Sequence, residues 1–456
     1  MLSSSGTEKG AMTGSASGVF DSYNDTVLSS EKGVAVVGSS NVDLTFRVPR
    51  FPKLGETLSA LSFEQHFGGK GANQAFCISK LSSKEPRVVF VSVVGNDSYG
   101  IEMKQYYKEN HFYHVDKNIH TAVKSSSITT SSSTTSSTTS TPIDNNNTTT
   151  IATTTSSTTS STTSTTSTPI DNNNTTTIPT GQALIFVENE SGNNSIVLVG
   201  GSNDLFSVEM VDKSWDDISQ CRVVVCQNET PLPTTYYTLK RAKQEGIITI
   251  FNAAPALNIL NLPESCRDLP KYVDYLICNE SESPIVIGKN PLDSDFIQND
   301  TLIEEMCREI HEKLNIPNVI ITLGERGCAA LYSQQDDLQN DDEKEQGVSL
   351  QDNTNRSDSG GKSSGDDGGK SSSSGGDDGT CSLQFIHVKG KKVEHVVDTT
   401  GAGDAWVGSF AYFISCDIPI PDSMELSNFI ASITVQHAGA QLSYNSLSQS
   451  IILDKL

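Results

Sequence analysis

The stretch Val393–Ile414, VEHVVDTTGAGDAWVGSFAYFI, joins an apolar run to an apolar helix through a polar, glycine-rich turn. We expect a strand that ends at Asp398 and then a helix with its apolar residues on one face. Gly401 and Gly403 allow successive amide groups to converge at the start of that helix, where the helix dipole favours an anion. Asp404 either caps the helix or accepts a proton from a hydroxyl group that attacks a phosphate.

A second glycine cluster precedes another expected helix, in HFGGKGANQAF at His66–Phe76. Glycines allow the backbone to approach a ligand closely, and Lys70 and Asn73 offer hydrogen-bonding groups at the helix start. A flexible loop that leads into an ordinary helix explains the pattern equally well. The spacing differs from the Gly-x-x-x-x-Gly-Lys-Ser/Thr of a P-loop, so we expect no P-loop here.

Three shorter polar clusters each follow an apolar run. Asn41 and Asp43 stand two residues apart and face the same side, which suits a polyhydroxyl ligand such as a sugar, or else forms an Asx turn. Asn279 and Glu282 stand at a strand-to-helix junction, where they hold Mg²⁺ waters near a nucleotide phosphate or form a capping pair. The turn Gly324–Gly327 either borders a nucleotide or is a plain hairpin turn.

The apolar runs alternate with helical patterns, and this alternation predicts a doubly wound, mainly parallel sheet. In such sheets ligands bind beyond the carboxyl ends of the strands, where each polar cluster falls. We also expect a hairpin from residues 182–187 and 194–200. The expected sheet strands lie within residues 33–46, 88–95, 222–229, 247–256, 273–280 and 318–327.

Much of the 456-residue chain is too polar to fold. The N-terminal tail 1–30 and two inserts, at 125–179 and 333–380, bury too little apolar surface to offset the entropy of ordering. Without them roughly 320 residues remain, which suggests one large α/β domain. We assign that domain to residues 31–446 and a short C-terminal tail to 447–456.

The net charge and the cysteine pattern indicate which partners and which cellular environment to expect. The net charge is −23, and the insert at 333–380 contributes twelve acidic and four basic residues, so nucleic-acid or membrane partners are not expected. Nine unpatterned cysteines indicate reduced intracellular thiols. The first residues lack a secretory signal, and no apolar run has the length of a membrane helix.

Taken in order, GGKGANQA, NESE, TLGERG and DTTGAGDAWVGSF resemble the PfkB family of carbohydrate and adenosine kinases. The resemblance runs from about Val34 to about Ser446 apart from the two inserts, and GGKGANQA with GAQLS at 439–443 points to its ribokinase branch. It implies a ribokinase-like α/β fold with a small β-sheet lid, and ATP-dependent phosphorylation of D-ribose at O5 to D-ribose 5-phosphate. The alternatives are a related kinase for fructose, deoxyribose or adenosine, or a non-catalytic binding protein. A dinucleotide-dependent oxidoreductase is disfavoured, because VVGSSN has a single glycine.

The resemblance also implies roles for individual positions. Asp404 is the expected base, and Gly401, Ala402 and Gly403 form the expected anion hole. The positions that match sugar contacts are Asn41, Val42, Asp43, Gly69, Lys70, Gly71, Ala72, Asn73, Glu229 and Asp404. Those that match ATP contacts are Asn279, Thr322, Leu323, Gly324, Glu325, Arg326, Gly327, Gly403 and Asn428.

The implied cofactors are ATP, Mg²⁺ and an activating K⁺. Asn279 and Glu282 match positions that hold Mg²⁺ through water. The positions that match K⁺ ligands are Asp398, Thr400, Thr434, His437, Gly439 and Ser443. Leu442 departs from the proline that the family usually has, which puts the ligand role of Ser443 in question.

The resemblance further implies a lid built from residues near Leu44–Phe63 and Gln182–Val199, and a homodimer that forms through this lid. The first insert interrupts the chain between lid strands. We expect a cytoplasmic enzyme, with the nucleus as a second compartment.

Overall fold

The computed structural model describes residues 33–82, 88–123, 177–190, 194–290, 299–333 and 382–447. The expected N-terminal tail, nearly all of both inserts and residues 448–456 lie outside these ranges, so the domain boundaries stay a prediction.

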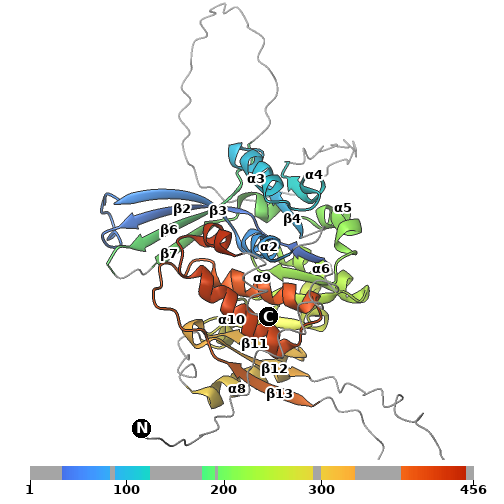
Figure 1. Cartoon of the computed structure of the whole chain (residues 1–456). Helices are drawn as coiled ribbons and strands as arrows, with labels where there is room; N and C mark the ends of the chain where they lie inside the picture. Colours follow the sequence, from blue (N-terminus) through green and yellow to red (C-terminus); the bar gives the residue numbers. More distant parts are fainter. Residues whose placement is uncertain are drawn as a thin grey trace, which may run out of the picture.

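Nine strands of the described chain form one sheet in the order β13-β12-β11-β10-β9-β8-β1-β4-β5 (Figure 1). Pairing is parallel from β11 across to β5, whereas β12 and β13 pair antiparallel at one edge. The predicted doubly wound, mainly parallel sheet is therefore confirmed. The strands are β1 (Val34–Val37), β4 (Val89–Val94), β5 (Ile119–Thr121), β8 (Val223–Gln227), β9 (Ile248–Asn252), β10 (Tyr275–Asn279), β11 (Asn318–Thr322), β12 (Cys328–Ser333) and β13 (Leu383–Val388).

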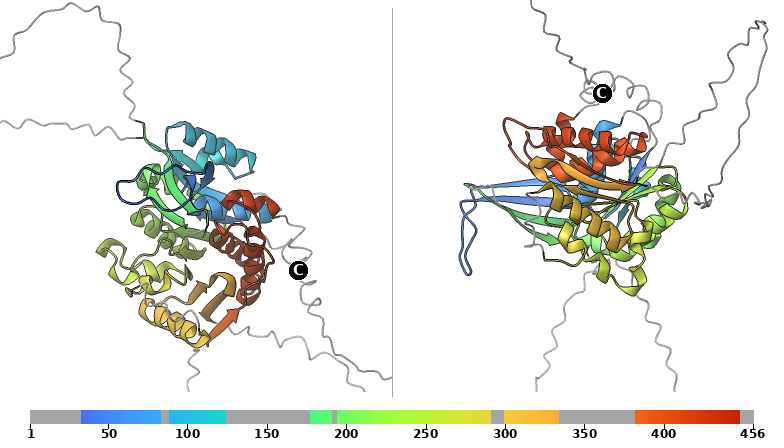
Figure 2. Two further views of the ribbon diagram at one scale, coloured as in Figure 1. Left: turned by 90° about the vertical axis from the view of Figure 1, so that its left-hand side faces the viewer. Right: turned by 90° about the horizontal axis from the view of Figure 1, so that it is seen from below.

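Helices cover both faces of this sheet (Figure 2). Val34 and Val36 of β1 face one core and Ala35 and Val37 face the other, which explains why the central strands are apolar throughout. The first core holds α2 (Lys70–Leu81), α3 (Ser98–Glu109), α9 (Ala402–Ser415) and α10 (Ile420–Thr434). The second holds α5 (Val208–Ile218), α6 (Leu232–Gln244) and α8 (Asp300–Leu314).

Short helical turns complete the connections. Three of them are α-helical and six are 3₁₀ turns in the described chain. They are α4 (Val115–Asn118), α7 (Ser283–Val286), α11 (Ala440–Ser443), η1 (Gly201–Leu205), η2 (Ile259–Asn261), η3 (Glu264–Cys266), η4 (Leu269–Tyr272), η6 (Gly324–Arg326) and η7 (Tyr444–Ser446).

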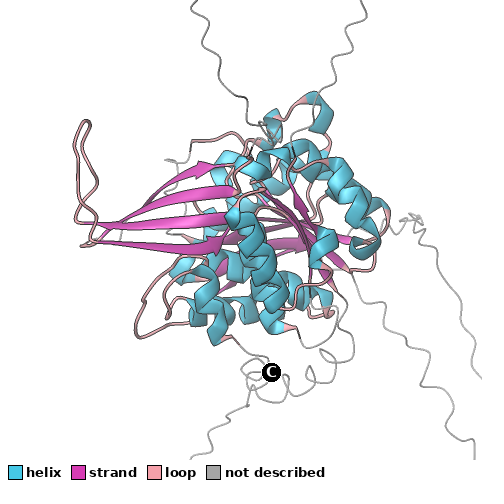
Figure 3. Cartoon of the chain, turned by 90° about the horizontal axis from the view of Figure 1, so that it is seen from above, coloured by secondary structure: helices cyan, strands magenta, loops and turns pink. Residues whose placement is uncertain are grey.

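A second sheet extends beyond the helices on one side of the molecule (Figure 3). Its order is β3-β2-β6-β7, and it matches the expected lid. The strands reach further toward the main sheet than the sequence indicated: β2 is Asn41–Val48, β3 is Ser62–Gly68, β6 is Gly181–Glu188 and β7 is Asn194–Val199. Only three residues separate the end of β1 from the start of the lid, which places Asn41 and Asp43 within a lid strand.

One expected strand is absent, and this prediction was wrong. Residues 389–399, which include VEHVV, form neither strand nor helix. Val396 and Val397 are each 60% exposed, and the amide groups of Val397 and Asp398 both donate to the carbonyl of Val435. An apolar run predicts a strand only where a neighbouring strand and a core can receive it.

Within the described ranges, no helix combines the length and the apolar character that crossing a bilayer requires.

Candidate active site

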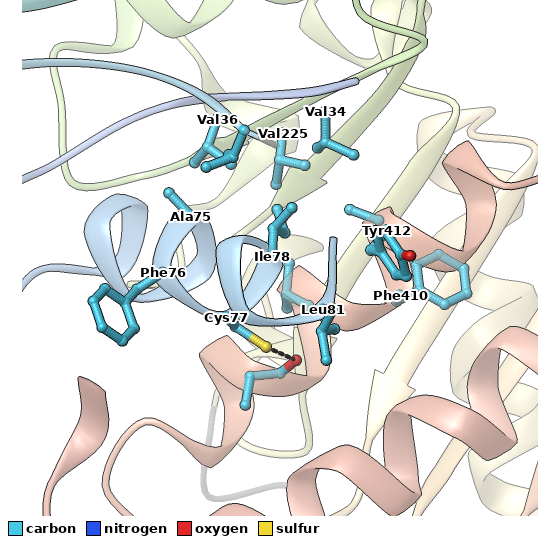
Figure 4. Packing of buried hydrophobic residues seen from close by; sticks show 14 of the residues in the cluster. Val34, Val36, Ala75, Phe76, Cys77, Ile78, Leu81, Val225, Phe410 and Tyr412 are labelled. Carbon is cyan, nitrogen blue, oxygen red and sulfur yellow. Dashed lines mark hydrogen bonds between the residues drawn. The ribbon is translucent and has the colours of Figure 1, made fainter. Parts of the chain in front are cut away.

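The first turns of α2 and α9 meet at the carboxyl end of β1, and this meeting point holds Asp404. The half-buried Asp404 carboxylate accepts a hydrogen bond on each oxygen: Asn73 Nδ2 donates to Oδ2 at 2.9 Å and Gln74 Nε2 donates to Oδ1 at 3.2 Å. The two helices also touch along their length, where the Cys77 thiol donates to the carbonyl of Ala405 (Figure 4). The candidate base on α9 is therefore held by two side chains of α2, and the contact with Gln74 spans 330 residues of sequence.

The turn before α9 has the geometry of an anion site. Gly401 has a φ of 78°, and a side chain on it would press against Ala440. Its carbonyl accepts from the Tyr444 hydroxyl at 2.6 Å, and the amide of Ala402 donates to Thr399 at 3.2 Å. Gly403 is exposed with open space beside it, and first-turn amides have no acceptor within their own helix. An anion therefore has access to Gly403 rather than to Ala402.

The second glycine cluster lets the backbone at the start of α2 lie directly against the backbone that follows β1. Gly69 has a φ of 94°, and a Cβ atom on Gly71 would lie 2.6 Å from the amide nitrogen of Ser39. These glycines allow the start of α2 to press against the β1–β2 connection. There Glu229 Oε2 accepts from the Ser39 hydroxyl at 2.6 Å and from the amide of Lys70 at 3.0 Å. Val42 and Ala72 are fully buried in the core, so their roles in sugar binding stay a prediction.

A cavity of about 470 Å³ lies between the lid and this junction. Two of the predicted sugar-contacting residues, Asn41 and Glu229, line it. Leu198 of β7 and Asn228 also line it, and sequence reasoning missed both. Asn203, another missed residue, donates to Asn41 Oδ1 at 2.7 Å and so fixes how that amide faces the cavity.

The site concentrates carboxylates around one ammonium group. Burial raises the pKa of Asp43 to about 7, with further contributions from Glu229 and Asp404. Burial acts to lower the pKa of Lys70, yet the surrounding carboxylates raise it overall. These carboxylates belong to Asp404, Glu229, Glu282 and Asp43. Residues predicted for the sugar side and for the nucleotide side thus come together around Lys70.

On the nucleotide side, Asn279 and Glu282 form the capping pair that the sequence offered as one alternative. The amide of Glu282 donates to Asn279 Oδ1 at 2.8 Å, and the amide of Asn279 donates to Glu282 Oε2 at 2.9 Å. Burial raises the pKa of Glu282, although the bond from Asn279 opposes this. Because Asn279 Oδ1 already accepts several bonds, this pair suits a hydrated Mg²⁺ better than direct coordination. The magnesium role stays a prediction.

The turn from Thr322 to Gly327 packs against the start of the loop that leads to Asp398. Gly327 has a φ of 93°, and a Cβ atom on it would lie 2.1 Å from the carbonyl of Val388. Leu323 is buried, Glu325 is exposed, and the Arg326 guanidinium donates to Asp300 at 2.9 Å. A cavity of about 640 Å³ opens beside this loop against the outer face of α10, and it was not expected from the sequence. Lys392, His395 and Phe429 are among its lining residues.

Asn428 has a clear structural role. Its Oδ1 accepts from Trp406 Nε1 at 2.8 Å, and its Nδ2 donates to the carbonyls of Val388 and Lys389 at 3.1 and 3.3 Å. It is only 5% exposed, so it ties α9, α10 and the end of β13 together. A contact between Asn428 and adenine stays a prediction.

The predicted K⁺ positions converge only in part. Asp398 accepts from the amides of Thr400 at 2.9 Å and Gly439 at 2.8 Å, so the two loops meet on its carboxylate. Thr434 and Ser443, which lie within five residues of Gly439 in the sequence, are both buried. His437 is exposed. Within the described ranges no three His, Cys, Asp or Glu side chains form a metal cluster. Backbone oxygens are a donor type that K⁺ accepts in proteins, and the K⁺ role of these positions stays a prediction.

Comparison with known proteins decides the family. Residues 31–158, 169–346 and 374–447 match the pfkB family carbohydrate kinase. The chain belongs to this family. It is therefore a kinase, and the resemblance seen in its motifs is confirmed.

Individual relatives agree with this assignment. A ribokinase of Dictyostelium discoideum is 28% identical over 422 residues, which cover 91% of this chain and 98% of the relative. A deoxyribokinase of Salmonella typhi is 28% identical over 417 residues, which cover 91% and 96%. The structure of Arabidopsis thaliana ribokinase complexed with ribose and ATP has the same fold, with a TM-score of 0.60, 21% identity and coverage of 93% and 98%.

The raised pKa of Asp43 yields a prediction for this kinase. In the folded protein the carboxyl binds its proton up to about pH 7, against 3.8 ordinarily, so the free energy of unfolding falls as the pH rises through this interval. Asp43→Asn removes that ionisation. We expect its Tm to exceed that of the wild type by roughly 3–6 °C at about pH 8 and to match it at about pH 4, by scanning calorimetry.

The surface variant Asp268→Asn is the control, since it makes the same substitution at an exposed carboxylate that pairs with Lys271. A constant difference between Asp43→Asn and the wild type across this range would contradict the prediction.

Proposed function

We propose that this chain is a ribokinase: it transfers the γ-phosphoryl group of ATP to O5 of D-ribose and releases ADP. The observation that carries the proposal is the Asp404 carboxylate, bonded on both oxygens, beside the first-turn amides of α9 and close to a cavity walled by Asn41 and Glu229. The similarity to ribokinases supports ribose as the acceptor.

In the proposed reaction Asp404 accepts the proton of the attacking hydroxyl. The O5–H bond breaks as the bond from O5 to phosphorus forms, and the bond from phosphorus to the bridging oxygen of ADP breaks, so ADP leaves with the electron pair. Charge on the transferring group is stabilised by the first-turn amides near Gly403 and by the Lys70 ammonium group. Asp404 then releases its proton to solvent.

Sugar selection is proposed for the lid side of the site. Asn41 and Glu229 would bind ribose hydroxyls from the cavity wall, and Asp43 would accept from a hydroxyl in its ionised form. The lid strand β7, through Leu198, would close over the sugar and exclude water, which would otherwise compete as an acceptor.

Two metal ions complete the proposal. Asn279 and Glu282 would hold the waters of Mg²⁺, whose chemistry is to neutralise phosphate charge. Asp398, with backbone oxygens near Thr400, Thr434 and Gly439, would hold K⁺ behind the anion site. His437 and Ser443 complete the set predicted for that ion.

A second candidate function is a deoxyribokinase, because relatives of that name match this chain as well as the ribokinases do. A coupled ADP assay with ribose, deoxyribose, fructose and adenosine separates the candidates. We expect the kcat/KM for ribose to exceed the others at least about 10-fold, and we expect activity to fall when K⁺ is omitted. A preference for deoxyribose would establish the second function, and no ADP release with any acceptor would favour a non-catalytic binding protein.

Asp404→Asn tests the proposed base. We expect kcat to fall by about 10³-fold, because the amide cannot take the proton, while ribose binding measured by calorimetry stays within about 3-fold. Asp422→Asn is the matched control, since Asp422 stands in the first turn of the adjacent helix α10. An equal fall in kcat in the two variants would show that Asp404 only stabilises the start of its helix and does not take the proton.

We also propose a homodimer that forms through the lid. The edge strand β7 exposes four consecutive apolar residues, Ile196–Val199, each between 46% and 54%. Pairing with a second copy would cover Ile196 and Val197, which do not line the cavity, and would satisfy the strand edge. We expect a solution mass of twice the 49.0 kDa chain by light scattering, and a monomer for Val197→Asp. A monomeric wild type would refute the dimer.

A further inference from the structure

We propose that Gln74 is a positioning residue that holds the Asp404 carboxylate in its reactive orientation. Its amide is fixed in turn by a buried chain of side chains that ends on a backbone carbonyl. The inference deepens the proposed function and rests on it, since it assigns a role in the same proton transfer to a fully buried residue.

Gln74 lies in the first half of α2 with no exposed surface. Its Nε2 donates to Asp404 Oδ1 at 3.2 Å and to Asn252 Oδ1 at 3.0 Å. Its Oε1 accepts from Gln227 Nε2 at 2.7 Å. The side-chain amide of Gln74 is therefore bonded to residues of three elements, β8, β9 and α9.

The donor and acceptor roles in these hydrogen bonds follow from the backbone carbonyl of Ile277. Asn252 Nδ2 donates to the carbonyl of Ile277 at 3.2 Å, and a backbone carbonyl can only accept. Asn252 must therefore present its oxygen to Gln74, and Gln74 must present its NH₂ group to Asn252 and Asp404. Reversing either amide would place oxygen against oxygen in a buried setting, which costs the desolvation of both groups.

This arrangement gives Asp404 a donor on each oxygen, Gln74 on Oδ1 and Asn73 on Oδ2. Asn73 is itself held by Gln441, whose Nε2 donates to Asn73 Oδ1 at 3.0 Å. Two donors fix the plane of the carboxylate, whereas one donor permits rotation about the Cβ–Cγ bond. Since Gln74 does not line the 470 Å³ cavity, its loss should affect the proton transfer and not substrate binding.

Gln74→Met tests the inference, because methionine keeps the length of the side chain and removes both donors. We expect kcat to fall between about 10- and 100-fold, while the KM values for ribose and ATP stay within about 3-fold. Ser79→Ala is the control: Ser79 is also buried on α2, but its hydroxyl bonds only the carbonyl of Phe76. A general loosening of α2 would lower kcat in both variants, and this outcome would overturn the inference.

Gln74→Glu adds a readout that a merely structural role would not change. Two adjacent carboxyl groups share a proton at lower pH, so the introduced carboxyl group can then donate to Asp404, and it loses that ability once both groups are ionised. We expect the ratio of kcat for Gln74→Glu to that of the wild type to fall as the pH rises from about 6 to about 9. A ratio that is independent of pH would overturn the inference.

These outcomes separate the inference from the proposed function. A wild type that turns over ribose while Gln74→Met is folded and equally fast would overturn the inference alone. A wild type that phosphorylates no sugar would overturn the proposed function and the inference with it.

Discussion

The backbone contact between α2 and α9 sets the position of the Asp404 carboxylate relative to the side-chain amides that bind it. A Cβ atom on Gly408 would lie 2.7 Å from the carbonyl of Gln74, and one on Gly71 would lie 2.6 Å from the amide nitrogen of Ser39. Glycine at these positions lets α9 touch α2, and α2 touch the end of β1, without an intervening side chain. Only at that separation can side-chain amides of α2 reach a carboxylate on α9. The position of the Asp404 carboxylate therefore depends on the absence of a Cβ atom at Gly71 and at Gly408.

The charge distribution shows what this close packing costs. Burial raises the pKa of Asp43 to about 7, and the nearby carboxylates of Glu229 and Asp404 add to this rise, so the ionised site lowers the stability of the fold near neutral pH. Lys70 offsets part of the repulsion but stands among four carboxylates. Such a cluster opposes folding and suits a ligand rich in hydroxyl donors. The loss of stability is thus an argument that the site is built for binding and chemistry.

Local patterns predicted much of the fold. The helix Asp300–Leu314 follows local signals at both ends, with Asn299 capping its start and Asn315 ending it in a left-handed conformation. Patterns failed where long-range contacts decide. The run VEHVV has the composition of a strand, but among the described residues no strand pairs with it, and the main sheet ends at β13. The roles of Gln74 and Asn203 could not be predicted, because their key partners lie 330 and 162 residues away.

Overall similarity does not choose between a ribose and a deoxyribose acceptor, because relatives of both kinds are 28% identical to this chain. The wall of the cavity gives a physical criterion instead. Asn41, Asn228 and Glu229 line it with polar groups, and a polar group that a hydroxyl should satisfy is left unpaired by the deoxy sugar. An apolar wall would discriminate weakly between the two. These polar side chains are the groups that the proposed ribokinase would use to distinguish ribose from deoxyribose.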